Sequence, residues 1–155
     1  MLIFLDIDGV MLPCKSWVNP QNLSDGFPAF SNKAIGVLNK IITPDTTIVI
    51  TSSHKSRFNP QEWKDIFKRR GINIDNLFTL APPSFGMSRK DEILNWFKFN
   101  PSNEDFIIID DDKSLNDLPH SIKESLIQTS ATIGLTEEHF EEIVSKLKSP
   151  TITAP

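Results

Sequence analysis

The chain has 155 residues, a length that fits one domain with a single hydrophobic core. Apolar residues make up 39% of the sequence and charged residues 23%, as in an ordinary folded protein, and the formal net charge is −4. That charge excludes a basic field over the whole molecule, and with it strong non-specific binding to nucleic acid. No apolar stretch reaches the length of a membrane span, and a single cysteine suits a reducing compartment. We therefore expect a cytoplasmic protein with no membrane partner.

The first half of the chain predicts two strands and one helix. Residues 2–7 are apolar except for Asp6, a pattern typical of a buried central strand. Residues 10–30 contain three prolines and one glycine and predict an irregular flap loop. Ser31 is a suitable N-cap for a helix that runs to about Ile42, and residues 47–50 predict a second buried strand.

The middle of the chain continues the alternation. Pro60 opens a helix of about ten residues that ends at Gly71. Residues 72–80 predict a third, weaker strand, and residues 81–87 predict a loop. Ser88 caps a further helix, which stops before Pro101 because the residue before a proline disfavours helical geometry.

The last third contains the most apolar strand, at residues 106–109, directly before three consecutive aspartates. A short helix near Ser121, a short strand at 126–129 and a final helix from Thr136 follow. Strands that alternate with helices indicate an α/β fold whose mainly parallel sheet is covered on both faces. We expect one domain over residues 1–148 and a frayed tail over 149–155.

Acidic and hydroxyl side chains follow the strongest strands. The carboxyl ends of parallel strands lie at one edge of the sheet, which is where open α/β folds bind ligands. The residues expected to converge there are Asp6, Asp8, Thr51, Asp110 and Asp111. Clustered carboxylates repel one another, and a hard cation relieves this; Mg²⁺ prefers oxygen ligands of this kind. The scattered histidines and lone cysteine offer no zinc site.

Four segments in the right order resemble the haloacid dehalogenase (HAD) superfamily of phosphohydrolases. They are Phe-Leu-Asp-Ile-Asp-Gly-Val at 4–10, Ile-Val-Ile-Thr-Ser-Ser at 48–53, Arg-Lys-Asp-Glu-Ile at 89–93 and Ile-Ile-Ile-Asp-Asp-Asp at 107–112. The chain is most similar to the small HAD domain of the "Swiss army knife" RNA-repair proteins. The resemblance implies a three-layer, Rossmann-like HAD fold with a central, mainly parallel sheet and no large cap domain.

The resemblance also implies catalytic roles. Asp6 matches the nucleophile that forms an aspartyl-phosphate, and Asp8 matches the general acid and base. Thr51 matches the hydroxyl that binds the phosphoryl group. Either Arg89 or Lys90 is the cation that screens the phosphate from the nucleophile.

Further residues are expected to bind substrate or metal. Gly9 lacks a Cβ, so its backbone can turn sharply toward a phosphate. The expected substrate contacts are Gly9, Thr51, Ser52, Ser53 and Lys55, with Ser52 as the alternative to Thr51. The expected magnesium ligands are Asp6, Asp8, Asp110 and Asp111, and within the acidic run Asp111 comes first, with Asp112 and Asp117 also open.

We therefore expect a Mg²⁺-dependent phosphatase whose open site suits a nucleotide or the phosphorylated end of RNA or DNA. Trp17 and Phe27, with Lys55 and Arg57, could grip a nucleotide, or both aromatic rings could pack on the core. Two alternatives remain: a catalytically weak binding module of the same fold, and a phosphatase for small metabolites that is capped by oligomerisation. The chain would act as a monomer or a small homo-oligomer.

Overall fold

The computed structural model describes residues 1–15, 20–81, 86–101 and 103–148. One sheet contains five strands in the order β3-β2-β1-β4-β5, and every neighbouring pair is parallel. The strands are β1 (Leu2–Leu5), β2 (Thr47–Ile50), β3 (Asn76–Thr79), β4 (Phe106–Asp110) and β5 (Leu126–Gln128). The α-helices are α1 (Asn32–Ile41), α2 (Pro60–Arg69), α3 (Arg89–Phe99), α4 (His120–Lys123) and α5 (Glu137–Lys148). Short 3₁₀ helices occupy Lys55–Arg57 and Lys113–Asp117.

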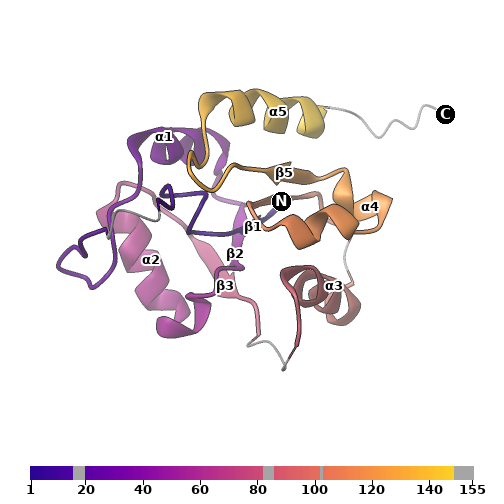
Figure 1. Cartoon of the computed structure of the whole chain (residues 1–155), viewed down its shortest axis with the longest axis horizontal. Helices are drawn as coiled ribbons and strands as arrows, with labels where there is room; N and C mark the ends of the chain where they lie inside the picture. The colour runs from indigo at the N-terminus through magenta and orange to yellow at the C-terminus, as the bar shows by residue number, and fades with distance from the viewer. Residues whose placement is uncertain (16–19, 82–85, 102, 149–155) are drawn as a thin grey trace.

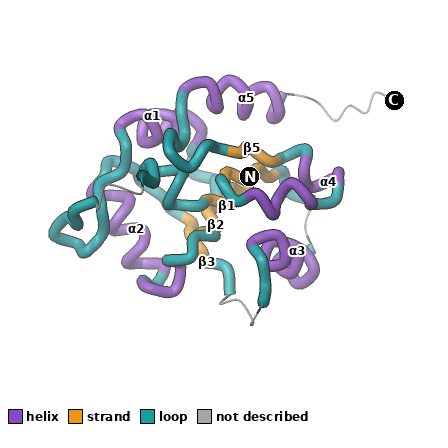
Figure 2. The backbone as a smooth tube through the Cα atoms, in the orientation of Figure 1, coloured by secondary structure: helices purple, strands orange, loops and turns teal. Residues whose placement is uncertain are grey.

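The helices cover both faces of the sheet, as Figures 1 and 2 show. Successive strand residues point to opposite faces, so β1 sends Ile3 and Leu5 to one side and Phe4 to the other. The first side packs against α1, α2 and α5, and the second against α3 and α4. The three-layer α/β fold expected from the sequence is therefore confirmed.

The helices begin at the residues that the sequence indicates. The Ser31 hydroxyl accepts a hydrogen bond from the Ala34 backbone and caps α1. Asn59 starts α2 and Ser88 starts α3, and each forms a reciprocal capping box with the third residue of its helix. Gly71 ends α2 at φ +84°, a backbone angle that glycine adopts without strain. The start of α3 matters most for the site, because it positions Arg89, the first residue of this helix.

The third strand is shorter than the sequence predicts, because residues 72–75 lie outside it. The Ile72 amide donates back to the Phe67 carbonyl at 3.0 Å, which turns the chain at the end of α2. Ile72 and Ile74 then pack into the core as part of the connection. Their alternating apolar pattern indicated a strand, but these residues lie in the connection and their side chains belong to the same core cluster as those of α2. The predicted strand at 2–7 likewise ends earlier, at Leu5.

The order of the strands reverses between β1 and β4. From β1 the chain builds β2 and β3 on one side of the sheet, and then returns through α3 to place β4 on the other side. Ligands of open α/β sheets bind at the carboxyl ends of the strands where the strand order reverses in this way. The described segments between β1 and α1, and between β2 and α3, contain no additional domain that could cover this edge of the sheet.

In the ranges that the structure describes, no helix is both long enough and apolar enough to cross a bilayer. The expected tail at 149–155 falls outside those ranges.

Candidate active site

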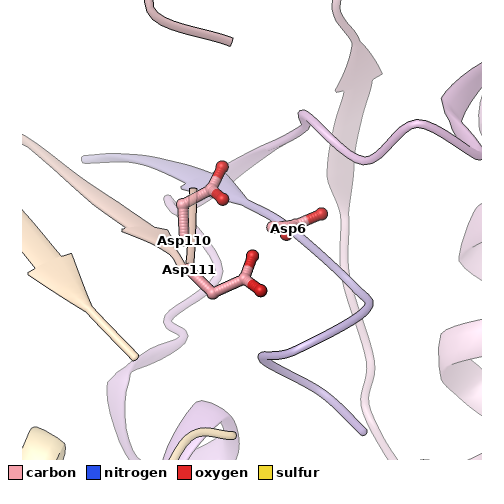
Figure 3. A group of neighbouring side chains, drawn as sticks. All are labelled: Asp6, Asp110 and Asp111. Atoms are coloured by element: carbon pink, nitrogen blue, oxygen red, sulfur yellow. The ribbon is translucent and has the colours of Figure 1, made fainter. Parts of the chain in front are cut away.

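Three aspartates from two neighbouring strands form the centre of the site. Asp6 follows β1 and Asp110 ends β4, and the parallel register of Leu5 with Ile109 places them side by side. Asp111 is the next residue along the chain. One carboxylate oxygen from each of the three lies within 4.8 Å of the others. Figure 3 shows the three side chains turned toward one common space.

Arg89 is the cation that reaches this cluster. As the first residue of α3, it places Nη1 2.6 Å from Asp110 Oδ2 and 3.6 Å from Asp6 Oδ1. Thr51, directly after β2, donates its hydroxyl to the same Asp110 oxygen at 3.2 Å. Lys90, the alternative cation, has no side-chain hydrogen bond or ion pair to any described residue, and its backbone amide donates to Ser114. The geometry thus favours Arg89 over Lys90 for the screening role.

Burial makes this cluster electrostatically unfavourable without a further cation. Burial, and then the charge of Asp110, raise the pKa of Asp6 to about 9, although Arg89 opposes the shift. Burial likewise raises the pKa of Asp110, again against Arg89. One guanidinium therefore does not compensate the carboxylates gathered here. Hard oxygen donors with an excess of negative charge fit a divalent cation such as Mg²⁺.

The three consecutive aspartates at 110–112 have different contacts. Both oxygens of Asp110 are engaged, because Oδ2 contacts Arg89 and Oδ1 accepts from the Asp112 amide at 3.0 Å. Asp112 caps the following 3₁₀ helix through the Ser114 amide. Asp111 is left as the least committed carboxylate of the run, while Asp117, at the end of that helix, does not belong to the cluster.

Gly9 lets Asp111 approach the loop after β1. A Cβ built on Gly9 would lie 2.6 Å from Cγ of Asp111, closer than real Cβ atoms come to another heavy atom, and φ at Gly9 is +82°. The Thr129 hydroxyl donates to the Gly9 carbonyl at 2.6 Å and holds this turn against β5. Any side chain at position 9 would push the carboxylate away from the cluster.

Asp8 lies apart from the three clustered aspartates. Its side chain is 41% exposed, and Oδ2 lies 2.6 Å from Nε2 of His54. The structure therefore brings together Asp6, Thr51, Arg89, Asp110 and Asp111, and places Asp8 at the open side of the site.

The remaining expected substrate contacts have other surroundings. Ser52 is fully buried and its hydroxyl accepts from the His54 amide, whereas Ser53 is exposed. The ammonium group of Lys55 lies 2.8 Å from Glu92, and both side chains are buried, so this charge is paired inside the protein.

Phe27 in the flap is not available to stack on a nucleotide. Phe27 is 1% exposed and contacts Phe30, Phe58 and Trp63 edge to face, which is the core-packing alternative. Trp17 lies outside the described residues.

Sequence reasoning missed His54, Glu92 and Thr129. The only local signal for His54 is its place three residues after Thr51, close to the end of a strand that carries site residues. Glu92 comes three residues after Arg89, and this spacing predicts that the two side chains are neighbours on the same helix face. Thr129 follows the short strand β5 and gives no signal that it would bind a glycine carbonyl 120 residues away.

A parallel sheet with a nucleophile-like aspartate after its central strand, and an acidic run after the neighbouring strand, defines the class of HAD-like α/β domains. The chain belongs to the family described as the HAD domain in Swiss Army Knife RNA repair proteins, whose model matches residues 2–140. Comparison with curated proteins and with solved structures gives no match. Domains of this superfamily are generally hydrolases of the phosphatase type, which fits the site described above.

Proposed function

We propose that the protein is a Mg²⁺-dependent phosphatase that acts through an aspartyl-phosphate on Asp6. The observation that carries the proposal is the convergence of Asp6, Asp110 and Asp111 at the end of the sheet, with Arg89 beside them. Phosphoryl transfer needs an in-line nucleophile and neutralisation of the equatorial oxygens, and this arrangement can supply both.

In the proposed reaction, a carboxylate oxygen of Asp6 attacks phosphorus while the bond from phosphorus to the leaving oxygen breaks. The leaving oxygen takes a proton from the Asp8 carboxyl group. Water then attacks phosphorus and gives a proton to Asp8, and the bond from phosphorus to Asp6 breaks. Inorganic phosphate is released, and both aspartates return to their starting states.

The other side chains hold the phosphoryl group. Arg89 screens its charge from the nucleophile, and Thr51 offers a hydroxyl beside the same position. Asp6 and Asp111, supported by Asp110, would hold Mg²⁺, which when bound neutralises charge on the phosphoryl oxygens. Asp8 turns its side chain toward His54, so we assign that side chain to proton transfer rather than to the metal.

The proposed substrate is a terminal phosphate on a large molecule, such as a nucleotide or the end of an RNA or DNA strand. Two points support it: no capping domain lies among the described residues near the carboxyl ends of β1 and β4, and the family is described from RNA-repair proteins. Asp8, which faces the leaving group in this mechanism, also has a more exposed side chain than Asp6 or Asp110. We propose that the chain acts in the cytoplasm as a monomer or small homo-oligomer.

The test is a phosphatase screen with nucleotides, 3′- and 5′-phosphorylated oligonucleotides and sugar phosphates, run with Mg²⁺ and with EDTA. We expect turnover of at least one class that EDTA abolishes and that Asp6→Asn removes. His120→Gln is the matched control, because the His120 side chain is 92% exposed on α4 and its ion-pair partner is Glu124, which is not a site residue. Turnover that survives EDTA or Asp6→Asn would refute the mechanism, and a lack of turnover throughout would favour a binding module.

A further inference from the structure

We propose that His54 is a positioning residue that fixes the Asp8 carboxyl group for proton transfer to the leaving oxygen. The inference rests on the proposed function, since it assigns a role in the same reaction. It concerns a residue that the sequence motifs do not include.

Asp8 needs support that the other aspartates of the site do not need. Asp6 and Asp110 are almost fully buried and are held by neighbouring groups, whereas the Asp8 side chain is 41% exposed. In the part of the chain that the structure describes, its side chain has one polar contact, the 2.6 Å approach to His54. An exposed carboxylate without that contact would sample several rotamers.

His54 is itself held on several sides. Its amide donates to the Ser52 hydroxyl, and its ring meets the Phe27 ring edge to face with centroids 5.6 Å apart. Arg57, whose guanidinium lies over Phe27 and Phe58, approaches His54 Nδ1 at 3.5 Å. The histidine is therefore preorganised by the buried aromatic cluster before any substrate arrives.

The proposal includes the tautomer that satisfies both contacts. Because Arg57 can only donate, its 3.5 Å approach suits His54 Nδ1 as an acceptor, and the ring proton is assigned to Nε2. Nε2–H then donates to Asp8 Oδ2. This hydrogen bond occupies one carboxylate oxygen and leaves Oδ1 free to exchange a proton with the leaving group. His54 thus decides which oxygen of Asp8 faces the substrate.

A residue that acts only through the general acid has a characteristic effect on substrates. A poor leaving group, such as an alkoxide, needs the proton at the moment the bond breaks, whereas a nitrophenolate leaves readily without it. Loss of His54 should therefore slow hydrolysis of alkyl phosphates far more than hydrolysis of aryl phosphates. A purely structural role would slow both substrates equally.

The experiment compares kcat and KM for glycerol phosphate and para-nitrophenyl phosphate in wild type, His54→Phe, His54→Gln and the surface control His120→Gln. His54→Phe keeps an aromatic ring against Phe27 but removes the nitrogen, and Gln restores a side-chain N–H donor. We expect His54→Phe to lose roughly 10- to 100-fold in kcat on glycerol phosphate, less than the roughly 10²- to 10⁴-fold that general acid–base catalysis contributes, because Asp8 itself remains. On para-nitrophenyl phosphate the loss should stay within about 3-fold, with KM little changed, and His54→Gln should recover most of the rate. Equal losses on both substrates, or no loss on glycerol phosphate, would overturn the proposal.

A second measurement separates this proposal from the phosphatase function itself. In ¹⁵N-labelled protein, long-range imidazole couplings should show His54 protonated on Nε2, and its proton signal should shift when Asp8 is replaced by Ala. If that shift is absent, the contact does not exist and the positioning role is wrong even if the wild type is active. If the shift is present but no substrate is turned over in an Asp6-dependent way, the phosphatase function fails and takes the catalytic role of His54 with it.

Discussion

Replacing Arg70 with Met should destabilise the fold more than any surface substitution on α2. The Arg70 side chain is 2% exposed and makes a bidentate pair with Asp25 in the flap, with Nη1 to Oδ2 at 2.6 Å. It also donates to the carbonyls of Ile66, Phe27 and Pro28. The substitution removes the Arg70 donors from three carbonyls and one carboxylate, although the Phe27 carbonyl keeps the Leu23 amide and Asp25 keeps the Phe27 amide as donors.

The expected loss of unfolding free energy is about 3–5 kcal/mol, which is the cost of removing one partner of a buried ion pair. In a domain of this size each kcal/mol shifts Tm by roughly 2–4 °C, so we expect Tm to fall by roughly 6–20 °C. Urea unfolding followed by circular dichroism measures the free energy directly. The control is Arg69→Met, because the adjacent Arg69 is exposed and donates a hydrogen bond to the exposed Ser24, so its loss should cost less than about 1 kcal/mol. A loss below about 1 kcal/mol for Arg70→Met would refute the reasoning.

The same pair predicts the acid sensitivity of the fold. Hydrogen bonds from Arg70 hold the pKa of Asp25 below its usual value. A carboxylate with a lowered folded-state pKa contributes its full stability above the unfolded-state pKa, about 3.9, and loses it as the pH falls through the folded-state value. The wild type should therefore lose more unfolding free energy than Arg70→Met between about pH 6 and about pH 3. Parallel losses in the two proteins would contradict this assignment.

Two further predictions concern Gly9 and the Lys55–Glu92 ion pair. Gly9→Ala forces a Cβ against the Asp111 carboxylate at a positive φ, so it should cost roughly 1–3 kcal/mol and reduce Mg²⁺-dependent turnover; wild-type stability and activity would show that the approach is not tight. Lys55→Met removes the ammonium partner of Glu92, whose side chain is 9% exposed, and should cost about 3–5 kcal/mol in urea unfolding; adding Glu92→Leu should recover at least half of that loss. If the double variant is as unstable as the single one, the ion pair is not the cause.

The sheet edge could be predicted from the sequence because it depends on strand geometry alone. Asp6 and Asp110 follow apolar runs, and parallel strands bring their carboxyl ends together whatever the loops do. The choice between Arg89 and Lys90 could not be predicted in this way. Neighbouring helix residues point roughly 100° apart, and only the packing of α3 on the sheet decides which one faces the clustered aspartates.

The contacts of His54 and Lys55 also depend on the complete fold. His54 meets a residue 46 positions earlier, across a loop that the aromatic cluster around Phe27 holds in place. A lysine is expected at the surface because it is charged, yet the Lys55 side chain is buried and pairs with Glu92 on α3. Similarly, Ile72 has the apolar character of a strand residue but serves the turn after α2.

The central claim is that Asp6 and Asp111, supported by Asp110, bind one divalent cation. Isothermal titration calorimetry of the purified protein with Mg²⁺ tests it without any knowledge of the substrate. The account predicts one ion bound per chain, and affinity reduced at least 10-fold in Asp111→Asn, since second-shell changes alone already cost 10- to 100-fold. An absence of Mg²⁺ binding in the wild type, or unchanged binding in Asp111→Asn, would contradict the account.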